Sequence, residues 1–364
     1  MKDESDLALR PPVINTNPGQ EYADNTRVFQ GIPGIERSPA GRLWALWYGG
    51  GDGETGENYV MVVTSGNDGN AWSPIKMVID PSFPVRAFDP CLWTDPAGRL
   101  WLFWAQSYHH FDGRAGVWAI VSGNPDVEDP SWSEPRRICN GIMMNKPNVT
   151  SSGKWLLPVT VWEWSERTDI PPEEKNANVI ASTDGGDTWG LLGGVERAGD
   201  GYCEHMVVEK EDGKLWMLIR GKFGIGESYS EDGGITWTRG RPFSIKHTGS
   251  RFFIRRLNSG KLILVKHGPI GAVTDRSHLT AYLSGDDGSS WSGGLLLDER
   301  LGVSYPDGVQ SPEGKVYIIY DYQRKGAKQI LMSTFNEDDM KSGAFTSGDA
   351  HQRILVNQAG PRNQ

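Results

Sequence analysis

Cysteine is scarce in this chain of 364 residues, and the rare cysteines do not form a pattern. Cys91, Cys139 and Cys203 are odd in number and far apart in the sequence. This spacing argues against a disulfide framework and against a structural zinc site, and it predicts buried, reduced thiols. We expect neither a metal ion nor a cofactor.

Long apolar runs and clusters of basic residues are also missing. No stretch approaches 18 consecutive apolar residues, so we expect no membrane span. The net charge of −9, without any run of Lys or Arg, argues against nucleic acid or an anionic membrane as the main partner. The first residues, Met1 to Asp6, do not resemble a secretory leader. A native leader could have been removed, so secretion or export to the periplasm stays open, as does the oligomeric state.

The sequence is rich in glycine and tryptophan, with 46 and 15 copies, and these residues recur in an eight-residue pattern, Ser-x-Asp-x-Gly-x-(Thr/Ser)-Trp. Clear copies are Ser182–Trp189, Ser230–Trp237 and Ser284–Trp291, a weaker one is Ser65–Trp72, and a vestige lies between Ser122 and Trp132. The spacing between copies is too long for a helical solenoid and suits a four-stranded β unit. Within each copy, Asp is suited to cap a tight turn, Gly to supply a positive φ and Trp to anchor the turn.

A second repeat predicts the number of units. A glycine followed by a basic residue precedes a short apolar or aromatic run six times, beginning at Gly41, Gly98, Gly153, Gly213, Gly260 and Gly314. Each run is bounded by turn residues, as strands are. We predict an all-β, six-bladed β-propeller that uses residues 1–364 as a single domain. The segment 7–20 is a candidate for closing the last blade. Trp44, Trp101 and the other strand tryptophans are expected in the core.

The octets are similar to the Asp-boxes of the sialidase (neuraminidase) superfamily, also called BNR repeats, and the resemblance extends from about Gln30 to about Arg324. Residues between the boxes extend this resemblance. In that family a Glu is followed by an Arg and a box, and here Glu204 and Arg220 precede the box at Ser230. A further family Arg stands before a strand that leads into a box, like Arg276. The family Tyr then follows in a turn, like Tyr305.

The resemblance implies a sialidase-like exo-acting glycoside hydrolase that removes a terminal acidic sugar, sialic acid or a related one, with retention. It implies that Tyr305 is the nucleophile and Glu204 its base, since the family uses a tyrosine in place of a carboxylate nucleophile. Arg220 and Arg276 would hold the substrate carboxylate, because guanidinium groups bind carboxylates bidentately. Each residue also has a structural explanation: Tyr305 could seal the last blade and Glu204 could cap a strand.

Two expected parts of the site are less well marked. The family acid is an Asp on a flexible first-blade loop, and the glycine-rich loop 49–57 offers Asp52, with Glu54 and Glu57 as alternatives. The first Arg of the family triad stands in an Arg-Ile-Pro motif, where this chain has Gly31 with Gln30 beside it. We take Gln30 as a candidate substrate-binding residue, and the carboxylate clamp is incomplete.

Other chemistries remain open for such a propeller. His109 and His110 follow a second-blade strand, and a His beside a Tyr could act as general base and acid. They would suit an exo-glycosidase or lyase acting on another acidic glycan linkage, such as rhamnose on glucuronate, or could be a surface pair. A carbohydrate-binding propeller without turnover is a third hypothesis. In each case the expected partner is a glycan or oligosaccharide.

Overall fold

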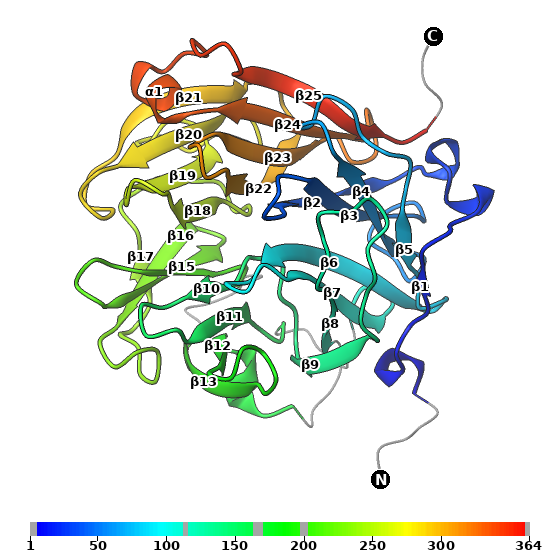
Figure 1. The fold of residues 1–364 in the computed structure, drawn as a ribbon. Helices are drawn as coiled ribbons and strands as arrows, with labels where there is room; N and C mark the ends of the chain where they lie inside the picture. The colour runs from blue at the N-terminus through cyan, green and yellow to red at the C-terminus, as the bar shows by residue number, and fades with distance from the viewer. Residues whose placement is uncertain (1–5, 112–115, 163–169, 197–202, 361–364) are drawn as a thin grey trace.

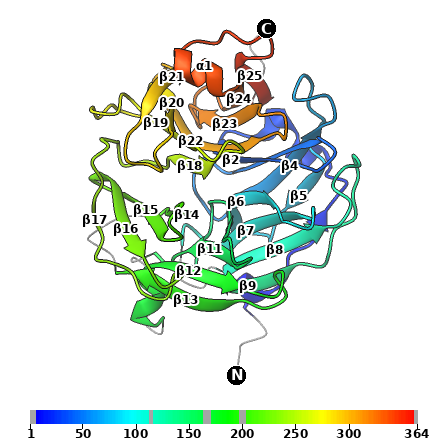
Figure 2. The same ribbon diagram turned by 60° about the vertical axis from the view of Figure 1, so that its left-hand side comes forward.

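The fold is a ring of small antiparallel sheets (Figures 1 and 2). The computed structural model describes residues 6–111, 116–162, 170–196 and 203–360. These residues form six sheets, five of four strands and one of five. The predicted all-β, six-bladed propeller is confirmed. Within the described residues, no helix is both long enough and apolar enough to cross a membrane.

Each blade is built from consecutive strands of the chain. The first three blades contain β2 (Gln30–Arg37), β3 (Leu43–Gly49), β4 (Tyr59–Ser65) and β5 (Met77–Ile79), then β6 (Val85–Thr94), β7 (Leu100–Tyr108), β8 (Gly116–Ser122) and β9 (Arg136–Asn140), then β10 (Asn148–Val149), β11 (Trp155–Val159), β12 (Ala177–Ser182) and β13 (Gly190–Val195). The last three contain β14 (Met206–Glu209), β15 (Leu215–Gly221), β16 (Gly224–Ser230) and β17 (Arg241–Pro242), then β18 (Phe253–Arg256), β19 (Leu262–His267), β20 (Leu279–Ser284) and β21 (Ser292–Asp298), then β22 (Val303–Gln310), β23 (Val316–Tyr322), β24 (Gln329–Phe335) and β25 (His351–Gln358). The short 3₁₀ helices are Leu7–Leu9, Gln20–Tyr22, Asp24–Thr26 and Pro172–Lys175, and α1 is Glu337–Ser342.

The Gly-basic pairs mark the turn into the second strand of every blade. Each of these turns needs a positive φ, as at Gly98 with φ 79°, which glycine adopts without strain. The second strands then lie in the blade interior, and β3 and β19 are buried along their whole length. Their tryptophans are core residues, with Trp44 and Trp101 at most 2% exposed. They are therefore not available as platforms for sugars.

The octets fasten the turn between the third and fourth strands of a blade. Ser182 Oγ donates to Asp184 Oδ1 at 2.7 Å and accepts from the Gly186 amide at 2.9 Å, while the Thr188 amide donates to Asp184. Hydrogen bonds from the Thr188 hydroxyl, the Thr188 amide and the Ser182 hydroxyl lower the pKa of Asp184 below its ordinary value. The pattern recurs in the boxes that begin at Ser65, Ser230 and Ser284. The Asp-box thus stabilises the turn between the third and fourth strands through hydrogen bonds.

The vestigial and missing boxes are replaced by related devices. In the second blade Ser122 Oγ donates to Asn124 Oδ1 at 3.1 Å, so an asparagine takes the aspartate place. In the sixth blade α1 joins β24 to β25, and Asn336 caps it by accepting from the amides of Asp338 and Asp339. Every blade therefore has a hydrogen-bonded connection at this position.

Ring closure differs from the sequence expectation. We expected segment 7–20 to complete the last blade, but β1 (Ile14–Asn15) pairs with β5 on the outer edge of the first blade, with Ile14 opposite Ile79. The last blade needs no added strand because the C-terminal chain supplies β25. The first and last blades are instead joined by backbone and side-chain hydrogen bonds. The Gln30 backbone amide donates to Arg324 O at 3.2 Å, and Gln30 Nε2 donates to Lys328 O at 2.7 Å and to Asn357 Oδ1 at 3.0 Å.

Candidate active site

A repeated bulge shapes the first strand of three blades. Ile32, Asp89 and Tyr305 each precede a proline, and each has a positive φ, of 60°, 47° and 55°. At these points the pairing register of β2, β6 and β22 shifts. A bulge re-aims the side chain it carries, and strained non-glycine residues gather at functional sites. Asp89 and Tyr305 therefore stand at equivalent positions of two blades.

Tyr305 lies in a buried hydrogen-bonded group with the residues predicted to act with it. Its hydroxyl donates to Glu204 Oε1 at 2.9 Å and accepts from Arg220 Nη1 at 2.8 Å. The Arg220 guanidinium also pairs with Glu204 and donates to Gly249 O. Burial raises the pKa of Tyr305 well above its ordinary value and Glu204 adds to this, while Arg220 and two further arginines act in the opposite direction. The phenol is thus neutral at rest with a proton acceptor in contact.

Two more guanidinium groups face the Tyr305 ring. The Arg276 Cζ lies 5.4 Å and the Arg324 Cζ 4.3 Å from the ring centroid. Arg276 has no carboxylate partner among the described residues, whereas Arg324 Nε pairs with Asp321 Oδ2 at 2.9 Å. Together with Arg220, three arginines surround one tyrosine.

Arg324 occupies the space left by the glycine in the Arg-Ile-Pro position. A Cβ added to Gly31 would lie 2.7 Å from Arg324 Cγ and 2.8 Å from its Cδ. The third guanidinium therefore comes from the connection after β23, in the last blade, and lies against β2 of the first. Sequence reasoning missed Arg324 because it looked for the arginine at residue 31 itself, and contact between the first and last blades is not encoded by local spacing.

Asp89 is a second residue that sequence reasoning missed. It is buried, and burial raises its pKa to about 8, with Arg86 opposing the shift and Glu54 and Glu204 adding to it. The signal was present in the sequence, since Pro33, Pro90 and Pro306 precede Gly41, Gly98 and Gly314 by the same eight residues. Because this spacing is the same in the three blades, Asp89 occupies the position in its blade that Tyr305 occupies in the last blade.

The glycine-rich loop contributes a different carboxylate from the one first chosen. Asp52 is exposed and forms no hydrogen bond or ion pair with a described residue. Glu54 reaches the arginine group, since its Oε1 lies 3.2 Å from Arg324 Nη1. The Glu57 side chain is exposed as well. Of the three loop carboxylates, Glu54 is therefore the one in contact with the arginines around Tyr305.

The chain also has a family assignment in sequence. Residues 41–318 match the family model of the BNR repeat-like domain. The chain belongs to the BNR repeat-like domain family. No curated protein matches it in sequence.

Solved structures share the fold of this BNR repeat-like protein. A Hadza microbial sialidase superposes with a TM-score of 0.68 at 18% identity, over 87% of this chain and 67% of that one. The intramolecular trans-sialidase of Ruminococcus gnavus, solved with oseltamivir carboxylate, gives 0.67 at 14% identity, over 90% and 98%. The leech intramolecular trans-sialidase gives 0.68 at 14% identity, over 91% and 71%. At these identities the likeness establishes a sialidase-like propeller fold.

Gln30 is not at the site of this BNR propeller, contrary to our expectation. Its side chain is completely buried, and Oε1 accepts from Arg27 Nε at 3.1 Å and from Trp47 Nε1 at 2.9 Å. Its amide nitrogen is bonded to the last blade, as described above. Alternation along β2 turns the side chain of residue 30 away from the face of residue 31. Gln30 therefore holds the ring closed.

The two candidate histidines lie apart from Tyr305. His109 is exposed, has a φ of 48° and has its ring against Phe83 at 6.3 Å. The His110 ring stacks on Trp162 at 6.1 Å, and burial followed by Arg86 lowers the pKa of His110. Its carbonyl accepts from Arg86 Nη2 at 2.6 Å. Neither imidazole contacts the Tyr305 hydroxyl or Glu204.

Metal binding has no support in the described part of the chain. No group of three His, Cys, Asp or Glu side chains there could hold an ion. Cys91 and Cys203 are buried and Cys139 is half-buried, all three as free thiols.

Proposed function

We propose that this protein is a sialidase-like exo-glycosidase that removes a terminal acidic sugar, sialic acid or a related one, with retention of configuration. The observation that carries the proposal is a neutral tyrosine hydroxyl bonded to a carboxylate and surrounded by three arginines. The likeness of the fold to sialidases supports it.

The arginines would bind the substrate carboxylate beside the reacting carbon. Arg276 has no acidic partner among the described residues, so its fork is open to a carboxylate. Arg324 shares its charge with Asp321 and Glu54, and Glu54 would release it when a substrate carboxylate enters. Arg220 is bonded to Glu204 and Tyr305 and so mainly positions the reacting pair.

Tyr305 would be the nucleophile, because a charged nucleophile would be repelled by the substrate carboxylate while a neutral phenol would not. Tyr305 Oη attacks the anomeric carbon as its proton passes to Glu204 Oε1 and the glycosidic bond breaks. The raised pKa of Tyr305 favours this coupled transfer over a standing phenolate. Water then attacks the same carbon, the bond from that carbon to Tyr305 Oη breaks, and the proton on Glu204 returns to Tyr305 Oη.

Asp89 is our candidate for the proton donor, replacing Asp52. A general acid must carry its proton at the working pH, and a pKa of about 8 keeps Asp89 protonated near neutrality. Glu54 is instead held in an ion pair with Arg324. The departing oxygen would receive its proton from Asp89, and Asp89 would later deprotonate the incoming water.

Replacing Tyr305 by Phe tests the proposal. We expect kcat on a fluorogenic sialoside to fall by more than about a thousandfold, as when a nucleophile is deleted. Binding of sialic acid, measured by calorimetry, should change far less because the arginines remain. NMR of the first-formed product should show the retained anomer. Undiminished turnover in Tyr305→Phe would contradict the tyrosyl mechanism.

The same assays address the other hypotheses. Release of rhamnose or an unsaturated uronate, abolished in His110→Ala and absent from sialosides, would move the assignment to a histidine-dependent enzyme. Sugar binding without turnover of any glycan would indicate a carbohydrate-binding propeller. Neither histidine ring is in contact with Tyr305 or Glu204 in the described part of the chain, which weighs against the histidine-dependent alternative.

A further inference from the structure

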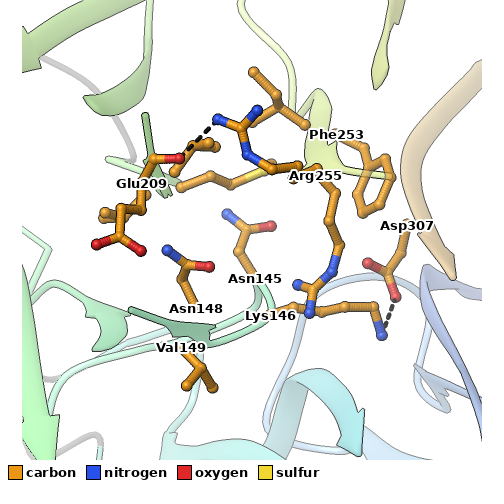
Figure 3. A pocket seen from close by; sticks show the side chains of 13 residues that line it. Asn145, Lys146, Asn148, Val149, Glu209, Phe253, Arg255 and Asp307 are labelled. Atoms are coloured by element: carbon orange, nitrogen blue, oxygen red, sulfur yellow. Dashed lines mark hydrogen bonds and ion pairs between the residues drawn. The ribbon is translucent and has the colours of Figure 1, made fainter. Parts of the chain in front are cut away.

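A polar cavity lies further along the inner strands, beyond the Tyr305 group. It has a volume of about 170 Å³ and is bordered by β14, β18 and the segment before β10 (Figure 3). Its lining on β14 is Met206–Glu209, which follows Glu204, and on β22 it reaches Asp307, which follows Tyr305. The proposed hydrolysis makes no use of this cavity.

Lys146 is a positively charged residue of the cavity lining. Its Nζ donates to Ile35 O at 2.6 Å and to Leu92 O at 2.7 Å, and it lies 3.0 Å from Glu36 Oε2 and 3.3 Å from Asp307 Oδ2. Two carboxylates thus neutralise this ammonium group, and its donors are fully used. Lys146 forms a wall of the cavity and is not a free cation.

Arg255 differs from its neighbours in having no acidic partner among the described residues. Its guanidinium makes one hydrogen bond, from Nη1 to Pro147 O at 3.3 Å. The adjacent Arg256 is ion-paired with Asp287 and donates to Glu209 O. Figure 3 shows the carboxylate of Glu209 on the other side of the cavity, away from Asp307 and Lys146. An uncompensated guanidinium fork on a cavity wall is suited to a carboxylate.

Asn145 adds an unpartnered acceptor. The side chain is 2% exposed, and its Nδ2 donates to His205 O at 2.9 Å, which fixes the orientation of the amide. Asn145 and Asn148 both line the cavity, and Asn145 Oδ1 and Asn148 Nδ2 are buried without a hydrogen-bond partner among the described residues. Buried polar groups without partners are costly, so a ligand that supplies a donor to Asn145 is favoured.

We propose that this cavity binds a small carboxylate carrying a neighbouring hydroxyl. The carboxylate would lie on Arg255 and accept from Asn148, and the hydroxyl would donate to Asn145 Oδ1. The volume resembles that of a cavity of about 150 Å³ that admits benzene, so a ligand of this size fits. The site is separate from the Tyr305 group and does not depend on the proposed hydrolysis.

Three matched small molecules test the site on the full chain. D-Glycerate has both groups, propionate lacks the hydroxyls and glycerol lacks the carboxylate. We expect glycerate to bind most tightly by NMR titration, with propionate weaker by about fivefold to tenfold and glycerol weaker still, as for loss of a hydrogen bond to a buried group. Equal affinities for glycerate and propionate would overturn the role of Asn145.

Variants show where glycerate binds. Arg255→Gln should weaken glycerate by about tenfold or more, since a charge-assisted pair is lost. Because Arg255 is half-buried with one hydrogen bond, this variant should fold, and Arg255→Lys should be intermediate. Arg241→Gln, an exposed arginine on β17, is the control. If Arg276→Gln abolished binding while Arg255→Gln did not, the ligand would occupy the Tyr305 group and the proposal would be wrong. No binding of glycerate to wild type would also refute it.

Discussion

Replacing Arg324 by Ala is a sharp test of the proposed carboxylate clamp. Its Cζ lies 4.3 Å from the Tyr305 ring centroid, so a carboxylate over that ring would lie near it. A guanidinium and a carboxylate about 4 Å apart are worth about 4 kcal/mol at an effective dielectric of 20. Arg220 and Arg276 remain in the variant, so we expect a loss of about 3 kcal/mol in transition-state binding. This corresponds to a reduction of kcat/KM by about a hundredfold or more.

The assay is steady-state hydrolysis of a fluorogenic sialoside, with thermal unfolding to correct for stability. Arg300→Ala is a matched control, because Arg300 stacks on Tyr322 with its Cζ 3.8 Å from the ring centroid and pairs with Asp298 outside the site. A change in kcat/KM of less than about twofold in folded Arg324→Ala would refute the clamp. So would an equal loss in the control.

Moving the arginine from residue 324 to residue 31 tests whether both positions share one space beside Tyr305. Gly31→Arg alone should destabilise the protein by about 1–3 kcal/mol, because its Cβ would collide with Arg324 Cγ at 2.7 Å. Combined with Arg324→Ala, the same substitution no longer meets the Arg324 side chain, and the Asp321 Oδ2 atom, 2.9 Å from the added Cβ, has to shift. We expect the double variant to be at least about tenfold more active than Arg324→Ala, since one guanidinium is restored. If the double variant is less active than both single variants, an arginine at residue 31 does not use the space that the Arg324 side chain leaves.

Three further outcomes follow from the structure. Asp89→Asn should lower kcat, because it removes the proposed proton donor, and the remaining activity should no longer fall above about pH 8. Because the folded pKa of about 8 exceeds the ordinary value of 3.8, wild-type stability should fall as pH rises between these values, and the variant should lack this slope in denaturant titrations. Asp184→Ala should lower Tm by removing the acceptor of the Thr188 amide, with kcat unchanged in the folded protein. Gln30→Leu should destabilise by about 2–4 kcal/mol, since Trp47 Nε1 and Lys328 O lose their buried partner, and glycerate binding should be unaffected once folding is corrected.

Most of the fold could be predicted from periodic features of the sequence. The Asp-boxes and the Gly-basic turns act through bonds between residues close in the chain, such as Ser182 with Asp184 and Gly186. Local turn chemistry of this kind is readable from one sequence. The six blades could therefore be predicted, and with them the register that relates Glu204, Arg220 and Tyr305.

Tertiary structure decided how the ring closes and what completes the site. The sequence alone determined the repeat, the blade count and the order of Glu204, Arg220, Arg276 and Tyr305, because these follow from spacing within and between repeats. It could not show that Arg324 fills the space over Gly31, or that Gln30 faces the last blade. Those contacts join the first and last blades, and they exist only because the ring brings residues nearly 300 positions apart into van der Waals contact.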